Sequence, residues 1–481
     1  MPADAPRVRG TTWALAGLLV LGLGLRLYHL GTGLWFDEIE TLVEYVRSPL
    51  GQILRDYHSN NQHPLYSVLA HLSIGALGES GAALRLPAAL LGTASLAAYY
   101  RLALRIVDRR EALLGMALLT FSYHHLWFSQ NARGYSGLLL LSLLATLALL
   151  RLLDEKTGWG AVAGYGLCAG LAVYIHPTAV LLAVAHAILL AWTWWRVRTT
   201  NRWLGRRAVA ALGCAAGVSL LLYAPMLGQV VTTLTGRNPH GAATAWQSPL
   251  WFVVESLRGL AGGLPGGWAG VAAAALVLLA GLLALWRQRP LLVALFLLPG
   301  LLTAVVLVLV HQNFWPRFFF FSAGFAVLVA LRGGFVLAQL LFGGRGRALA
   351  TGGAILAIAG SAATLPRAWR PKQDFLGAER QVERVRAPED AVVTVDLTEY
   401  PYLRWRGDAW EAARSLPALE AIEAQHRRTW LLYTFPVRLA VVQPGIWQRL
   451  AARYDTAAVF PGTVGGGDIV VMVSKASPPA P

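Results

Sequence analysis

Charged residues are scarce in this chain, and their scarcity decides its broad class. Only 14% of the 481 residues are Asp, Glu, Lys or Arg, whereas 56% are hydrophobic, and the mean hydropathy is +0.51. Soluble globular proteins carry about 25% charged residues. The low charge, together with long runs of Leu, Ala, Val and Gly, excludes an ordinary soluble domain and indicates a membrane protein.

Cysteine and acidic residues are also few. Cys168 and Cys214 are the only cysteines, and both lie inside apolar runs, so we interpret them as packing residues rather than as a disulfide or metal site. The chain has 41 Lys and Arg against 25 Asp and Glu, which gives a formal net charge of +16. Much of this excess lies in short connections between apolar runs, where positive charge sets membrane topology. We therefore expect no nucleic-acid partner.

A signal-peptide cleavage site is lacking near the N-terminus. Arg7 and Arg9 precede an apolar run over about residues 12–25, and no small-x-small motif precedes the polar segment that follows. We therefore predict an uncleaved first membrane-spanning helix, in which the Arg26 side chain extends outward to the interface.

Apolar runs long enough to cross a bilayer, about 20 residues each, occur throughout the first 365 residues. We count about eleven, near residues 11–30, 82–106, 111–128, 133–153, 159–176, 177–195, 207–227, 266–286, 290–310, 316–341 and 347–365. If the N-terminus is cytoplasmic, every cytoplasmic connection contains Lys or Arg, in agreement with the positive-inside rule. These basic connections are residues 105–110, 151–158, 194–207, 286–289 and 342–347. An odd number of spans then places the C-terminal region on the extracytoplasmic side of the plasma membrane.

Two long extracytoplasmic loops and a C-terminal domain complete the predicted organisation. The loops cover about residues 31–80 and 228–265, and loops of this length within a compact protein are commonly functional. From residue 366 onward, helical patterns alternate with short strands. This change predicts a small extracytoplasmic α/β domain over residues 366–481, after a membrane domain over residues 1–365. We expect a helix, a turn and a strand over 373–397, strands at 428–435 and 468–474, and helices at 418–426 and 446–454.

One stretch contains three of the scarce carboxylates. GLWFDEIET (33–41) follows the first apolar run and places Asp37, Glu38 and Glu40 within four residues. Apolar residues from this point on recur with helical spacing, and the polar ones fall on the opposite side. The apolar stripe comprises Ile39, Leu42, Val43 and Val46, and the polar side comprises Asp37, Glu40, Thr41 and Glu44.

This stretch predicts an interfacial helix that begins at or near Asp37. Its apolar face is expected on the lipid, and its acidic face toward an extracytoplasmic cavity. Trp35 and Phe36 precede it as interface anchors. A structural alternative assigns Asp37 to the helix cap, and Glu38 and Glu40 to favourable interaction with the helix dipole.

Further polar residues fall on the same predicted side of the membrane. They are His63 and Tyr66 in HPLY (63–66), Gln130, Asn131, Arg133 and Tyr135 in SQNARGYS (129–136), His176, and Arg317 in PRFFF (316–320). Structural roles are the alternatives: His63 as an exposed helix start, Arg133 bound to lipid headgroups, and His176 as a structural histidine. Together with the acidic stretch, the set favours chemistry on an anionic, membrane-borne substrate. Carboxylates supply a base, and Arg gives bidentate contacts to phosphate.

Four motifs carry a resemblance to a known family. WFDE (35–38), HPLY, SQNARGYS and PRFFF, in this order and topology, resemble GT-C fold glycosyltransferases of the dolichyl-phosphate-mannose–protein mannosyltransferase type. Bacterial relatives include lipid A aminoarabinose transferases and polyprenyl-phosphate-dependent galacturonosyl- and mannosyltransferases. The resemblance covers most of residues 10–340. It implies a polytopic helical GT-C fold and transfer of a sugar, with inversion, from a polyprenyl-phosphate carrier to a glycolipid, polysaccharide or protein.

The resemblance also implies roles for single residues. Asp37 matches the catalytic carboxylate of the first loop, and Glu38 would orient Asp37 or bind a metal ion. Arg133 and Arg317 would stabilise the phosphate leaving group. The motifs depart from the family at Asn131, where an acidic residue is common, and at His63, where lipid A transferases often carry Lys. The second departure disfavours an aminoarabinose donor.

These departures leave open whether the site binds a divalent metal ion. Asn131 is a weaker metal ligand than a carboxylate. The nearby histidines show no metal-binding spacing with an acidic residue. These histidines are His63, His124, His125 and His176.

Two other functions stay open. A lipid-linked sugar flippase or transporter would usually place its ionisable residues near the membrane midplane, often in two repeated halves. The sequence shows no internal repeat, and its charges gather at one interface. A non-catalytic membrane scaffold for cell-envelope assembly would instead use the C-terminal domain to bind a partner.

Overall fold

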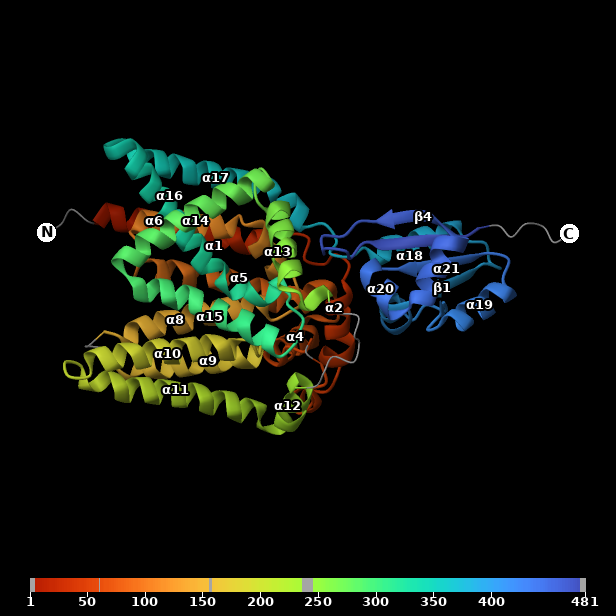
Figure 1. The fold of residues 1–481 in the computed structure, drawn as a ribbon, viewed down its shortest axis with the longest axis horizontal. Helices are drawn as coiled ribbons and strands as arrows, with labels where there is room; N and C mark the ends of the chain where they lie inside the picture. The colour runs from red at the N-terminus through yellow and green to blue at the C-terminus, as the bar shows by residue number, and fades with distance from the viewer. Residues whose placement is uncertain (1–4, 60, 155–157, 236–244, 476–481) are drawn as a thin grey trace. The chain divides into compact units, whose positions relative to one another are not determined.

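The computed structural model describes residues 5–59, 61–154, 158–235 and 245–475, and these form two compact units (Figure 1). The first, which we call the helical unit, comprises Met1–Leu30, Leu50–Gly236 and Gln247–Ala368. The second, the mixed unit, comprises Gly31–Pro49, Arg237–Trp246 and Trp369–Pro481. The predicted first extracytoplasmic loop is therefore divided. Its first part, Gly31–Pro49, folds with the C-terminal α/β domain.

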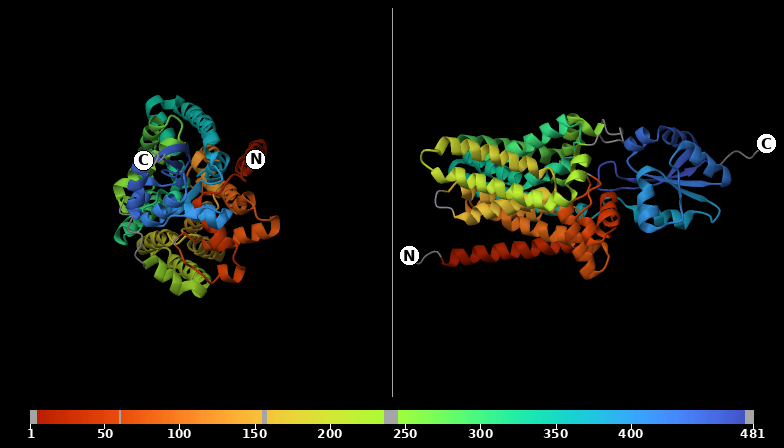
Figure 2. Two further views of the ribbon diagram at one scale, coloured as in Figure 1. Left: turned by 90° about the vertical axis from the view of Figure 1, so that its right-hand side faces the viewer. Right: turned by 90° about the horizontal axis from the view of Figure 1, so that it is seen from below.

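The helical unit consists of helices; most of the long ones run side by side, and the shorter α13 (Pro249–Gly263) lies across them (Figures 1 and 2). They are α1 (Ala5–Leu27), α3 (Leu50–Ile53), α4 (Pro64–Leu77), α5 (Gly81–Ala103), α6 (Arg109–Thr120), α7 (Tyr123–Ser129), α8 (Tyr135–Leu152), α9 (Trp159–Ile175), α10 (Ala179–Val197), α11 (Arg202–Tyr223), α12 (Leu227–Thr235), α13 (Pro249–Gly263), α14 (Trp268–Gln288), α15 (Pro290–Leu309), α16 (Ala323–Phe342) and α17 (Gly346–Ala368). A 3₁₀ segment, η5 (Pro316–Ser322), leads into α16.

Membrane-spanning character is clear for part of this set. Seven helical stretches of the described residues are long and apolar enough to cross a bilayer, and three shorter apolar helices cover Thr12–Leu27, Pro64–Leu77 and Trp159–Ile175. The predicted number of about eleven membrane spans stays a prediction. The single helix expected over residues 111–128 is wrong, because the chain breaks at Phe121 and Ser122. The Ser122 hydroxyl accepts the His125 N–H at 3.3 Å and so begins α7 as a new helix.

Polar contacts join several of the connections between helices at one end of the helical unit. Arg105 pairs with Asp154 at 2.6 Å, and Arg347 pairs with Asp108. The Arg289 guanidinium donates to the Arg105 carbonyl at 3.2 Å. Four of the five basic connections predicted from the sequence therefore meet at this end, which we call the basic end. Figures 1 and 2 show the start of α1 and the α10–α11 connection at the same end.

Glycine allows close packing between α9 and α11. A Cβ atom at Gly166 would lie 2.3 Å from the Cys214 sulfur, and one at Gly170 would lie 2.6 Å from Val218. Helices can approach this closely only where one partner has no side chain. Both cysteines are free thiols. Cys168 is half-buried and packs against the apolar core, whereas Cys214 is exposed and so differs from the packing role predicted from the sequence.

The mixed unit contains a five-stranded sheet in the order β2-β1-β3-β5-β4. Strand β1 pairs in parallel with β2 and β3, whereas β5 is antiparallel to β3 and β4. The strands are β1 (Ala391–Thr394), β2 (Glu411–Ala412), β3 (Thr429–Tyr433), β4 (Tyr454–Phe460) and β5 (Ile469–Ser474), and the accompanying helices are α18 (Phe375–Val385), α19 (Leu416–Gln425), α20 (Pro436–Val442) and α21 (Pro444–Arg453). Val393, Leu419, Leu431 and Ile446 are central in its apolar core. The predicted α/β domain is confirmed, and β2, β4 and α20 are additions to it.

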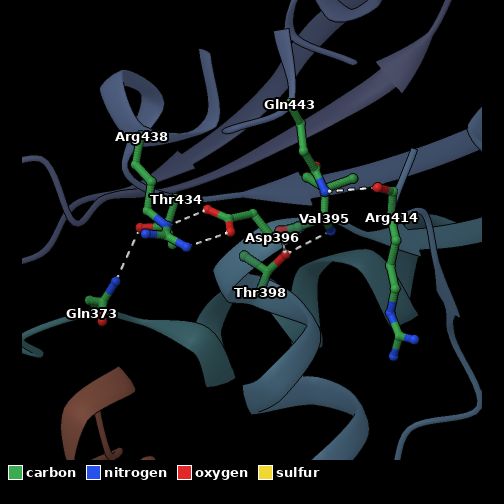
Figure 3. Close-up of polar contacts among 8 residues, drawn as sticks. All are labelled: Gln373, Val395, Asp396, Thr398, Arg414, Thr434, Arg438 and Gln443. Atoms are coloured by element: carbon green, nitrogen blue, oxygen red, sulfur yellow. Dashed lines mark hydrogen bonds and ion pairs between the residues drawn. The ribbon is translucent and has the colours of Figure 1, made fainter. Parts of the chain in front are cut away.

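The parallel strands β1 and β3 end in strained turns. Asp396 and Phe435 follow them with positive φ angles of 47° and 49°, a conformation that non-glycine residues adopt only with support. Asp396 receives it from Arg438, whose Nε and Nη2 donate to the two carboxylate oxygens at 2.8 and 3.1 Å (Figure 3). Thr434, beside Phe435, accepts a hydrogen bond from Gln373. This edge of the sheet is thus held by side chains.

Candidate functional site

The acidic segment, residues 31–49, is helical but short. It forms α2 (Phe36–Glu40), which continues as a π-helical turn, η1 (Thr41–Val46). The Glu38 carboxylate accepts the Trp35 N–H at 3.3 Å, and the Thr41 hydroxyl donates to the Asp37 carbonyl at 2.7 Å. Glu38 therefore caps the helix start, which is a structural role, while the Asp37 side chain lies one residue before the capping group.

Contacts to the α/β domain hold this segment in place. The Phe36 N–H donates to Gln373 Oε1 at 3.0 Å, and Gln373 Nε2 donates to Thr434 at 3.1 Å (Figure 3). The Tyr400 hydroxyl donates to the Glu44 carboxylate, and the Tyr400 ring lies 6.1 Å from the Phe36 ring. Gln373 is 1% exposed. It connects the start of α2 to the turn that follows β3.

Burial of the acidic segment corrects one prediction. Ile39 and Val46, expected to face lipid, are fully buried within the protein. The π-helical turn changes the spacing on which the predicted stripe depended. Asp37 is 8% exposed and Glu38 is 0% exposed, so neither is a solvated surface carboxylate.

The helical unit brings together five of the predicted site residues. We call this set the basic–aromatic cluster: His63, Arg133, Tyr135, His176 and Arg317, with Phe318 beside them. His63 precedes α4, Tyr135 begins α8 and His176 ends α9. The His63 ring lies 5.1 Å from Tyr135 and 4.9 Å from His176, and the His176 ring lies 5.3 Å from Phe318. The Arg133 guanidinium is 6.0 Å from the Tyr135 ring centroid.

Both histidines in the cluster are neutral at physiological pH. Burial, with the positive charges of Arg133 and Arg317, lowers the pKa of His176 to about 3. Burial is also the main cause that holds the His63 pKa well below its ordinary value, with Arg133, His176 and Arg317 adding to it. His63 Nδ1 lies 3.1 Å from the Ile175 carbonyl, which fits a neutral ring with its proton on Nδ1. The cluster therefore owes its positive charge to arginine.

Gly134 allows the cluster to form. A Cβ atom at this position would lie 2.7 Å from His63 Nδ1 and 2.9 Å from the Ile175 carbonyl. The Tyr135 hydroxyl is fully buried and makes no hydrogen bond within the described residues. A buried hydroxyl without a partner is costly, so a polar ligand atom would be well received there.

Three other predicted site residues have structural partners. The Tyr66 hydroxyl donates to the Leu84 carbonyl at 2.7 Å and pins α4 to α5. The Gln130 amide nitrogen donates to the carbonyls of Arg26 and Tyr28 at 2.9 and 2.6 Å. Asn131 is buried beside Gln130, and its carbonyl accepts the Arg133 N–H at 2.6 Å. Substrate contacts for these three residues stay predictions.

The prediction that Arg26 extends to the interface is wrong. It is fully buried, and its guanidinium donates to the Gly22 carbonyl at 2.7 Å and to Ser129 at 3.3 Å. A third nitrogen lies 2.7 Å from His125 Nδ1, and His125 Nε2 lies 2.9 Å from the Ser95 hydroxyl. Because every contact satisfies a buried polar group, this network fixes the end of α1 against α7.

Tyr57 is a buried residue that sequence reasoning missed. Burial raises the pKa of Tyr57 to about 12, and the charge of Arg133 opposes the shift, so Arg133 lies near it. Its hydroxyl makes no hydrogen bond within the described residues. The Tyr57 ring contacts Tyr223, which in turn contacts Tyr174. The only sequence signal was its place just before the polar run 58–63.

A metal centre finds no support in the side-chain arrangement. Within the described residues, no three His, Cys, Asp or Glu side chains are placed to hold an ion together. The four histidines considered in the sequence analysis do not lie together in the structure. His63 meets His176, but His124 lies 3.0 Å from the Gly259 carbonyl and His125 contacts Arg26. We therefore assign no chemical step to a metal ion.

Part of the chain matches a known family. Residues 61–228 match the family model described as dolichyl-phosphate-mannose-protein mannosyltransferase. This stretch contains the HPLY and SQNARGYS motifs, and with them four of the five predicted residues of the cluster. No curated protein has a matching sequence.

Two solved structures resemble this chain along nearly its whole length. ArnT from Cupriavidus metallidurans, bound to undecaprenyl phosphate, is 12% identical, with a TM-score of 0.52 over 100% of both chains. AglB from Archaeoglobus fulgidus, an archaeal oligosaccharyltransferase in complex with an inhibitory peptide and a dolichol-phosphate, is 13% identical. Its TM-score is 0.56 over 99% of this chain and 75% of its own. Identities this low establish a likeness of fold alone.

Proposed function

We propose that this chain, which has the predicted GT-C fold, is an inverting glycosyltransferase that uses a polyprenyl-phosphate sugar as donor. The observation that supports this most is the basic–aromatic cluster, in which Arg133 and two neutral histidines are buried and Arg317 is half-buried. Two guanidinium groups gathered in one cluster favour an anion, and a lipid-linked phosphate fits a helical membrane unit. The acceptor is a glycolipid, polysaccharide or protein.

Asp37 serves as the general base in this proposal. An acceptor hydroxyl is a weak nucleophile, and a positioned carboxylate removes its proton while the oxygen attacks the anomeric carbon. The new bond forms between that carbon and the acceptor oxygen. The bond to the phosphate oxygen breaks, and its electron pair leaves with the polyprenyl phosphate. Attack from the side opposite the leaving group inverts the anomeric centre.

Arg133 and Arg317 stabilise the leaving phosphate group. As the glycosidic bond breaks, negative charge grows on the phosphate, and fixed guanidinium groups stabilise it without reorganisation. The burial of Arg133 strengthens this effect, because a low local dielectric increases the interaction of charges. Glu38 is a positioning residue for Asp37, since its carboxylate holds the helix start.

The neutral residues of the cluster select the sugar. His63, His176 and the Tyr135 hydroxyl offer donors and acceptors without net charge, which suits sugar hydroxyl groups. The N-terminus is cytoplasmic and the α/β domain is extracytoplasmic in this proposal, because the basic end agrees with the positive-inside rule. The chain is thus a multi-pass plasma-membrane enzyme.

The test is donor turnover by the purified full-length protein. It would be reconstituted in nanodiscs and incubated with a panel of polyprenyl-phosphate sugars and candidate acceptors. Release of polyprenyl phosphate, followed by mass spectrometry, is expected for at least one donor. A parallel assay in sealed vesicles follows movement of the same lipids between leaflets.

The two assays separate the alternatives. Movement of lipid-linked sugar between leaflets without release of polyprenyl phosphate would show that the protein is a flippase and not a glycosyltransferase. Binding of donors without either event would favour a scaffold. An Asp56→Asn variant serves as the matched control, because Asp56 carries a carboxylate in the next part of the loop and, among the described residues, its side chain pairs with His58 alone.

A further inference from the structure

The connection between α10 and α11 has an unusual composition. Residues 192–207 contain five arginines and four tryptophans, and no Asp or Glu. The stretch closes α10, turns, and begins α11 with Asn201 capping the Leu204 N–H at 3.1 Å. It lies at the basic end of the helical unit (Figure 2). None of these residues belongs to the proposed catalytic machinery.

Three arginines in this connection stack on tryptophan rings. Arg196 lies 4.9 Å from the Trp192 ring centroid, and Arg198 lies 5.5 Å from Trp195. Arg206 lies 5.4 Å from Trp203 on the first turns of α11. Cation–π contacts of this kind restrict the guanidinium groups, and Arg198 also donates to the Trp195 carbonyl at 3.3 Å.

A cavity of about 520 Å³ opens between the two helices beside these stacked pairs. Its lining residues are Trp194, Arg202, Gly205, Arg206, Val209 and Ala210. Trp194 closes one side and packs directly on α11, since a Cβ atom at Gly205 would lie 2.5 Å from the indole nitrogen. Two guanidinium groups therefore share one cavity with an indole ring.

No carboxylate of the described residues pairs with the two arginines that line this cavity. Elsewhere at the basic end, Arg105 pairs with Asp154 and Arg347 with Asp108. Arg202 and Arg206 form no ion pair with any carboxylate of the described residues. Arg196 and Arg198 likewise form no ion pair with a carboxylate of the described residues.

We propose that this cavity is a binding site for the phosphodiester headgroup of an anionic phospholipid such as phosphatidylglycerol. Arg202 and Arg206 would contact the phosphate oxygens, because the guanidinium fork matches their geometry. A basic pocket between membrane helices at the predicted cytoplasmic side is where such headgroups bind. Trp192, Trp195 and Trp203 are half exposed beside it, as expected of rings at the headgroup level.

The apolar surroundings favour a lipid over free phosphate. Val209, which lines the cavity one turn further into α11, is 73% exposed, and such a surface suits an acyl chain. A soluble phosphate would use only the arginines. The proposal is independent of the glycosyltransferase assignment, since it concerns residues at the end opposite to the basic–aromatic cluster.

Native mass spectrometry of the full-length protein tests the site. The protein would be released from detergent with added phosphatidylglycerol, with phosphatidylcholine, or with inorganic phosphate. We expect retention of phosphatidylglycerol alone. An Arg202→Gln/Arg206→Gln variant should lose roughly 25-fold in affinity, at about fivefold for each arginine near the membrane surface.

The control is Arg109→Gln/Arg110→Gln, which removes the same charge from the exposed start of α6. It should retain the lipid. Equal loss in both variants would show a diffuse charge effect and overturn the site, as would equal retention of phosphatidylcholine. Binding of inorganic phosphate with the same affinity would overturn the lipid assignment. A Gly205→Leu variant keeps every charge but fills the cavity, and it should also lose the lipid.

Discussion

The acidic segment of the mixed unit is held by hydrogen bonds to a folded α/β domain, whereas the basic–aromatic cluster of the helical unit is held by ring contacts between helix ends. In the first, Gln373 and Tyr400 fix a short helix from outside. In the second, His63, Tyr135 and His176 contact one another directly. The difference teaches that the proposed proton-transfer group and the proposed phosphate-binding groups are supported by separate structural means. Each can therefore be altered without the other.

The largest expected effect is on proton transfer. Asp37→Asn removes the proposed base but keeps size and most hydrogen bonds, so kcat should fall roughly 10²–10⁴-fold. The affinity for polyprenyl phosphate should be unchanged, since the arginines are intact. Turnover and lipid binding would be measured on the same preparation. Full activity in Asp37→Asn would remove the carboxylate from the mechanism.

The second effect reverses this pattern. Arg317→Gln should lower turnover by about 10²-fold or more, because a fixed charge that stabilises the leaving group is lost. It should also weaken binding of polyprenyl phosphate, which Asp37→Asn leaves alone. Isothermal titration with the free lipid phosphate gives the affinity, and Arg109→Gln serves as the charge control. Unchanged binding in Arg317→Gln would break the proposed division between the units.

A smaller effect concerns the anchor of the acidic segment. Gln373→Leu leaves the Phe36 N–H and the Thr434 hydroxyl without their partner, at a cost of about 1–3 kcal/mol. Amide hydrogen exchange of residues 31–49 should accelerate roughly tenfold or more. Gln373→Glu should restore protection, because a carboxylate accepts the Phe36 N–H as the amide oxygen does, and the Thr434 hydroxyl, which accepts from Gln373, can rotate to donate to it.

The matched control for this anchor is Gln425→Leu, at an exposed position at the end of α19. It should leave exchange of residues 31–49 unchanged. Equal exchange in Gln373→Leu and the unaltered protein would mean that the segment holds its shape without the α/β domain.

The smallest effect is the pH dependence of stability. The pKa of His176 is lowered to about 3 in the folded protein, whereas in the unfolded chain the pKa is about 6.5. Between these values the unfolded state binds more protons, so stability is complete above about pH 6.5 and is lost as pH falls. His176→Gln should reduce the decline of Tm between pH 7 and pH 5. An identical decline in the variant would contradict a buried, neutral His176.

Regular elements of the chain could be predicted from the sequence, because local patterns specify them. The helices and strands of the α/β domain follow amphipathic spacing and β-branched runs such as RTWLLYTF (428–435), and they form where expected. The GT-C fold follows from four short motifs in a fixed order. These signals lie within a few turns of chain, so no tertiary information is needed to read them.

Tertiary contacts explain what the sequence could not supply. Arg26 satisfies all the local rules for a side chain that extends to the interface, yet its partners are Ser129 and His125, about 100 residues away. Ile39 has the spacing of a lipid-facing stripe but is buried in the protein. Gln373 carried no motif at all, and its importance follows only from a bond to Phe36.

The division of the chain has a consequence for its synthesis. Gly31–Pro49 leaves the ribosome early, but Gln373 and Tyr400, which hold it, follow their partners Phe36 and Glu44 by 337 and 356 residues. At roughly 5–20 residues per second, the ribosome needs tens of seconds to supply them. The acidic segment must wait for that time without the domain that holds it. Its buried carboxylates can therefore reach their final environment only when the last domain emerges, so a prematurely terminated chain would lack the assembled segment.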